Sequence, residues 1–250
     1  MRRLLRFAAI VAVAAAGLLV AGPALAQSVS LDLGSGGPTV TGRIVQLLAL
    51  ITVISLAPSI LVMVTSFTRI VVVLAFVRTA LGTPQTPPNQ VIVGLALFLT
   101  MFVMMPTFEK SYDAGIQPLL AGRIDEMQAI ERAAAPLGDF MAAHVREQDV
   151  ALFFDLAGVK DTAVGPDVRP PYRVLIPAFM ISELRRAFEI GFLVFVPFLI
   201  IDMVVATVLM SMGMMMLPPV VVALPFKIIF FVLVDGWYLI VGSLVRSYGG

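Results

Sequence analysis

The segment between Asp202 and Lys227 constrains the fold of this chain more than any other. It reads DMVVATVLMSMGMMMLPPVVVALPFK and holds 24 uncharged residues between one acid and one base, with methionines crowded ahead of two prolines. Because Pro219 lacks an amide hydrogen and its ring clashes with the preceding turn, the segment predicts two apolar helices that meet at a break. A turn that faces water usually carries Asn, Asp or Ser, whereas thioethers are flexible and weakly polar. We therefore expect an apolar or variable neighbour against this turn.

The composition indicates that the bilayer, or a large apolar assembly, is the solvent of this chain. Apolar residues make up 60% of the sequence and charged residues 13%, whereas soluble domains carry about 25% charged residues. The absence of cysteine excludes disulfides, thiolate catalysis and cysteine metal sites, and one histidine, His144, leaves few catalytic schemes. The sequence contains no phosphate loop and no basic nucleic-acid patch. It therefore predicts a membrane protein with no cofactor, no bound structural or catalytic metal and no nucleic-acid partner, and it disfavours a membrane-embedded enzyme.

The first 26 residues are typical of a cleaved signal peptide. Arg2, Arg3 and Arg6 form a basic start, residues 7–20 are apolar, and residues 24–26 form an A-x-A cleavage site. The alternative is an uncleaved anchor helix. Residues 27–43 are rich in Gly, Ser and Thr and are predicted to be a flexible lead-in.

Two hydrophobic helical regions are expected within residues 44–106. Residues 44–68 form a run of 25 uncharged residues, long enough to cross about 30 Å of hydrocarbon, with a kink expected at Pro58. The helical pattern continues to Arg69 and Arg78, which are nine residues apart and so point in opposite directions. Arg69 therefore needs a partner outside this helix, and Arg78 is typical of a cytoplasmic end. The second helix begins near residue 91 and is expected to stop at Pro106.

Residues 107–173 are acidic and of ordinary globular composition, and they predict a small extracytoplasmic helical domain in which Asp149 caps a short helix. Residues 174–250 hold the last two hydrophobic helical regions, joined at the methionine-rich turn. The predicted fold is therefore an all-α membrane protein with four hydrophobic helical regions, some kinked or arranged as a hairpin.

The last two regions carry buried charges that need partners, since each costs about 2.5–3.5 kcal/mol at mid-bilayer. They include Glu183, Glu189, Asp202, Lys227 and Asp235. If the helices fold back at Met215, Asp202 lies 13 residues before the break and Lys227 lies 12 residues after it, at nearly equal depth. This spacing suggests an intramolecular pair. The alternative is an interface between copies, where Glu183 competes for Lys227.

Several long blocks in one order resemble the FliP family of flagellar export gate subunits. They are TSFTRIVVVLAFVRTALGTPQTPPNQVIVGLALFLTMFVMMP, SELRRAFEIGF, PFLIIDMVVATVLMSMGMMMLPP and LPFKIIFFVLVDGW. The resemblance implies a pentamer that, with FliQ-like and FliR-like subunits, forms a channel for unfolded exported flagellar proteins. It also implies a location in the bacterial inner membrane, in the flagellar basal body.

The resemblance further implies roles for particular residues. A pore gasket is expected at Met212, Met214, Met215 and Met216, and an ion pair between subunits is expected at Glu183 and Lys227. The rival hypothesis from the residues alone is an ion or metal transporter that uses Asp202, Lys227 and the methionine cluster. For the methionines, core filling is a further alternative.

Overall fold

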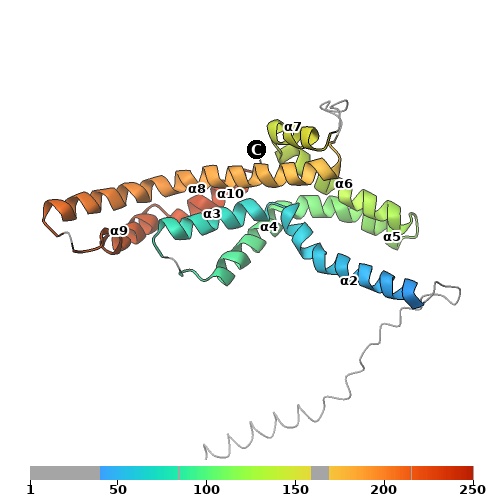
Figure 1. Ribbon diagram of the computed structural model, residues 1–250, viewed down its shortest axis with the longest axis horizontal. Helices are drawn as coiled ribbons and strands as arrows, with labels where there is room; N and C mark the ends of the chain where they lie inside the picture. The colour runs from blue at the N-terminus through green and yellow to red at the C-terminus, as the bar shows by residue number, and fades with distance from the viewer. Residues whose placement is uncertain (1–39, 84, 159–168, 215, 250) are drawn as a thin grey trace, which may run out of the picture. The chain divides into compact units, whose positions relative to one another are not determined.

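The computed structural model describes residues 40–83, 85–158, 169–214 and 216–249, and every regular element among them is a helix (Figure 1). The expected all-α class with apolar, membrane-length helices is confirmed. The expected signal peptide lies outside the described residues, as do residues 27–39 of the lead-in. The chain divides into two compact units at Ile51, and every helix after α2 lies in the second of them.

Helix α2 (Val40–Met63) contains Pro58 and ends before the predicted uncharged run does. A short turn separates it from α3 (Phe67–Ala80). Side-chain hydroxyls hold this turn, because Thr65 and Thr68 both donate to Val62 O, at 3.5 and 3.4 Å. Such bonds compete with the helical backbone pattern, which explains why one apolar run forms two helices.

Helix α4 (Asn89–Ser111) continues through Pro106, so the prediction that this proline stops the helix is wrong. A π-helical turn, η1 (Tyr112–Ile116), and the short α5 (Gln117–Leu120) extend it. The chain after Pro106 packs against α6 (Glu126–His144), and a Cβ added to Gly115 would lie 2.5 Å from Ala129 O. Packing of η1 on α6 therefore sustains the helix beyond the proline, in agreement with the tolerance of helices for proline where tertiary contacts compensate.

Helix α7 (Glu147–Leu156) lies after α6 and packs on α8 (Tyr172–Ser211). Asp149 does not cap α7 as predicted, because Arg146 occupies the N-cap position. The Asp149 carboxylate instead accepts a hydrogen bond of 2.6 Å from Ser182 Oγ on α8. A carboxylate that reads as a cap in the sequence thus anchors one helix to another.

The long helix α8 packs against α3, α6, α7 and α9, and Pro177 and Pro197 lie within it. After the methionine turn, α9 (Pro219–Leu233) and α10 (Gly236–Arg246) return along it with a bend of 62° between them. Helices α3 and α9 both contact α8, and buried residues of α10 share a core with α3 (Figure 1). Within the described residues, Asn89–Leu120 and Tyr172–Ser211 are long and apolar enough to cross a membrane, as is the bent α9–α10 pair if counted as one.

Candidate functional site

The turn that carries the methionines is closed by its own backbone. The amide of Gly213, where φ is +73°, donates to Met210 O at 3.1 Å, and the amide of Met214 donates to Leu209 O at 3.0 Å. This pair of bonds is a Schellman motif, which favours glycine at its left-handed position. Pro219 then starts α9 at a position where an amide hydrogen has no helical partner. The backbone geometry therefore depends on Gly213 and Pro219 and places no demand on the methionine side chains.

The described methionines of this turn are exposed in the single chain. The exposed fractions are 67% for Met212, 40% for Met214 and 98% for Met216, while Met215 lies outside the described residues. Core filling therefore does not account for Met216. Flexible thioethers at the end of an apolar hairpin can instead pack against a surface whose shape varies.

Lys227 joins three helices. Its Nζ donates to Asp202 Oδ2 on α8 at 2.6 Å and to Ala80 O at the end of α3 at 3.2 Å. The ammonium group carries three hydrogens, so the chain itself satisfies two of them. A cation at the carboxyl end of α3 also interacts favourably with the helix dipole. Lys227 is therefore a buried connection between α3, α8 and α9.

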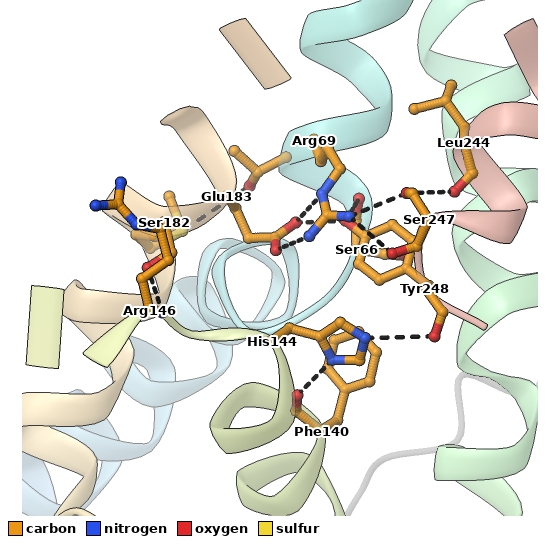
Figure 2. A network of polar contacts seen from close by, with 12 residues as sticks. Ser66, Arg69, Phe140, His144, Arg146, Ser182, Glu183, Leu244, Ser247 and Tyr248 are labelled. Carbon is orange, nitrogen blue, oxygen red and sulfur yellow. Dashed lines mark hydrogen bonds and ion pairs between the residues drawn. The ribbon is translucent and has the colours of Figure 1, made fainter. Parts of the chain in front are cut away.

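A second buried cluster lies at the opposite end of α3 (Figure 2). Arg69 and Glu183 are both 0% exposed. Arg69 Nε donates to Glu183 Oε2 at 2.9 Å, and Arg69 Nη2 makes a second, shorter contact with Oε1. This forked arrangement is the strongest form of an arginine–carboxylate pair. The expectation that Arg69 finds its partner outside α3 is therefore confirmed.

Residues that follow α10 complete this cluster, as Figure 2 shows. Ser247 Oγ accepts a hydrogen bond of 3.0 Å from Arg69 Nη1. The Tyr248 hydroxyl donates to Glu183, and the Tyr248 ring lies 3.8 Å from the centre of the Arg69 guanidinium. His144 on α6 places Nε2 3.4 Å from Tyr248 O. Four segments of the chain thus meet around one ion pair.

The remaining predicted charges lie at the surface of the chain. Glu189 accepts from Arg185 Nε at 2.9 Å, one helical turn away, and both side chains are exposed. Asp235 is exposed at the bend between α9 and α10, where its φ is +50°. Among the described residues, no three His, Asp or Glu side chains gather as a metal site would require.

The structure pairs the predicted residues differently from the resemblance. Within the chain, Lys227 contacts Asp202, as the spacing around the turn suggested, whereas Glu183 contacts Arg69 and Tyr248. Glu183 and Lys227 are both buried and already have partners within the chain. An ion pair from Glu183 of one copy to Lys227 of another stays a prediction, and it requires an exchange of these partners.

Sequence reasoning missed His144, Ser247 and Tyr248 as members of the cluster. Ser247 and Tyr248 come directly after an apolar helix, where polar residues usually mean only that the helix has reached water. Their partner Arg69 is 178 positions away from Ser247. No local pattern in the sequence connects positions so far apart.

Comparison with known proteins places the chain in a family. The model of the FliP family matches residues 50–244. A protein of Caulobacter vibrioides is 58% identical over 98% of this chain and 92% of its own length. A protein of Bacillus subtilis is 54% identical over 86% of this chain and 96% of its own length, and one of Aquifex aeolicus is 48% identical over 92% and 96%. Each of the three is named flagellar biosynthetic protein FliP. The chain belongs to the FliP family.

Proposed function

We propose that this chain is a ring-forming subunit of the flagellar type III protein export gate. In this proposal, several copies surround a channel through which unfolded flagellar proteins leave the cell. Membership of the FliP family supports the flagellar role, and the relatives named above are flagellar biosynthetic proteins. The sequence comparisons give no support to the alternative of an ion or metal transporter.

The observation that carries the proposal is the exposed methionine turn. In the single chain, Met216 is 98% exposed at the end of a hairpin of two apolar helices. A solvent-facing turn would normally be polar. In a ring of copies, the turns converge on a central opening, where their thioethers pack against one another or around a moving polypeptide. An apolar constriction of this kind also excludes ions by dewetting.

The remaining parts of the proposal concern assembly and location. The ring contains five copies and associates with FliQ-like and FliR-like subunits in the inner membrane, within the basal body. Residues 1–26 are a signal peptide that is cleaved off, and residues 107–173 face the periplasm. The pore conducts protein and carries out no catalysis. Glu183 and Lys227 of adjacent copies form an ion pair in the assembled ring, in place of the partners each has in the single chain.

The test is the replacement of Met214, Met215 and Met216 together by alanine in cells that assemble the gate. Shorter side chains leave the constriction open, so we expect cells to leak small ions, measured as loss of membrane potential. Met203→Ala is the matched control, because Met203 is also exposed on α8 but lies away from the turn. Unchanged permeability of cells with an assembled triple variant would contradict the role of the turn as a seal.

A further inference from the structure

The last residues of the chain occupy hydrogen-bonding positions that nothing else in the cluster fills. Arg69 directs Nε and Nη2 to Glu183, and among the described residues its Nη1 donates to the two oxygens of Ser247 alone, at 3.0 and 3.4 Å. Arg69 is 0% exposed, so water does not reach this nitrogen while the cluster is closed. An unpaired buried donor on a charged group is costly. Ser247 therefore completes the set of partners of Arg69.

Tyr248 adds a hydrogen-bond partner for Glu183 and covers the ion pair between Arg69 and Glu183. Its hydroxyl donates to Oε2, the oxygen that also accepts from Arg69 Nε. Burial, and secondarily the charge of Glu183, raises the pKa of the Tyr248 phenol, so the hydroxyl remains a donor. Its ring lies over the guanidinium of Arg69 at a distance that gives a cation–π contact. The Tyr248 side chain thus donates a hydrogen bond to the ion pair and covers it with its aromatic ring.

Tyr248 also reaches α6. Its ring stacks near Phe140 at a centroid distance of 5.9 Å and near His144 at 5.2 Å. His144 Nδ1 lies 2.8 Å from Phe140 O and its Nε2 lies 3.4 Å from Tyr248 O. These contacts connect the end of α10 to a helix that precedes it by about a hundred residues in the sequence.

We propose that Ser247 and Tyr248 form a latch that holds α10 in place against α3, α6 and α8. When the latch is open, Arg69 Nη1 loses its partners, Glu183 Oε2 keeps the bond from Arg69 Nε but loses the one from Tyr248, and the ion pair becomes open to water. The left-handed Asp235 interrupts the backbone between α9 and α10. The latch therefore holds the far end of α10, in addition to the core that buried residues of α10 share with α3. This inference concerns the folded chain and does not depend on the proposed export function.

The experiment measures opening of α10 through thiol accessibility in the purified full chain, which has no native cysteine. The reporter is Leu244→Cys, because Leu244 lies on α10 and is 0% exposed. Ser243→Cys reports the rate for an exposed neighbour on the same helix. Ala178→Cys reports global unfolding, because Ala178 is buried on α8 and is also 0% exposed. N-ethylmaleimide is the probe.

We expect Tyr248→Phe, which retains the ring and removes only the hydroxyl, to accelerate labelling at position 244 by about 10- to 100-fold, the range that corresponds to loss of a hydrogen bond to a charged group. Tyr248→Ala also removes the ring contacts, so it should accelerate labelling at 244 further. Labelling at positions 243 and 178 should stay unchanged in both variants, and the phenylalanine variant keeps the test available if the alanine variant does not fold.

The matched controls are Tyr238→Ala and Tyr238→Phe, because Tyr238 is also on α10 but is 71% exposed. These should leave all three labelling rates unchanged. The latch is refuted if Tyr248→Ala and Tyr248→Phe leave the rate at 244 unchanged. It is equally refuted if position 178 accelerates as much as position 244, since the residues would then stabilise the whole fold and not α10 in particular.

Discussion

Replacing Arg69 by methionine tests whether the buried ion pair is a central support of the fold. Methionine retains most of the volume of the arginine stem but removes both hydrogen bonds that Arg69 donates to Glu183. The carboxylate would then remain buried with the Tyr248 hydroxyl as its one remaining partner among the contacts described. Breaking one side of a buried pair costs about 3–5 kcal/mol, because the charge left behind is uncompensated.

The same magnitude follows from the individual bonds. Arg69 donates two hydrogen bonds to Glu183, and bonds to charged groups contribute about 1.5–3 kcal/mol each. For a chain of this size, a loss of about 3–5 kcal/mol corresponds to a fall in Tm of roughly 6–20 °C. Thermal unfolding of the purified protein in detergent measures this shift.

A double variant separates the effect of the paired charges on stability from the effect of side-chain volume. Arg69→Met combined with Glu183→Leu replaces both charges by apolar groups, and such replacements are often nearly neutral for stability. We expect the double variant to be more stable than either single variant. Arg185→Met is the control, because its pair with Glu189 is exposed, and we expect no measurable change in Tm. Equal shifts for Arg69→Met and Arg185→Met, or a double variant no more stable than the singles, would refute the reasoning.

Two further predictions address the other charge pair and the helix bend. Lys227→Asp should impair folding, and adding Asp202→Lys should restore it in part, because these groups lie 2.6 Å apart in one chain. A second swap tests the proposed pair between copies. If that pair forms, Glu183→Lys should restore assembly to the Lys227→Glu variant, as measured by the native mass of the complex. Gly236→Ala should lower the free energy of unfolding by about 1–3 kcal/mol, because the added Cβ would lie 2.2 Å from a buried ring of α9. Gly94→Ala, with nothing within 4 Å of the added Cβ, should show no such loss in the same denaturation assay.

The sequence predicts a helix or a turn correctly where neighbouring residues alone determine the local structure. The hairpin at the methionine turn follows from the break at Pro219, and its symmetry gives the depth at which Asp202 meets Lys227. Spacing works here because the two helices are antiparallel neighbours joined by a short turn. The same reasoning fails at Pro106, because the helix there is sustained by packing on α6, which no local pattern encodes.

The Arg69 cluster shows the second limit of sequence reasoning. That Arg69 needs a partner follows from burial of a charge in an apolar helix. Which partner it finds depends on contacts that span 114 positions to Glu183 and 178 positions to Ser247. In the sequence, Tyr248 looks like an ordinary residue at the end of a helix. Only the folded chain shows that it closes the cluster.

The length of α8 limits where this protein can reside. Its 40 residues measure about 60 Å at 1.5 Å per residue, twice the thickness of the hydrocarbon core. Tilt alone would need an angle of about 60° to fit such a helix into lipid, beyond the usual range of 0–40°. Residues 190–211, which follow the exposed charges at Arg185 and Glu189, measure about 33 Å and match the bilayer by themselves. A bilayer that holds residues 190–211 would leave the first part of α8, on which α6 and α7 pack, outside the hydrocarbon.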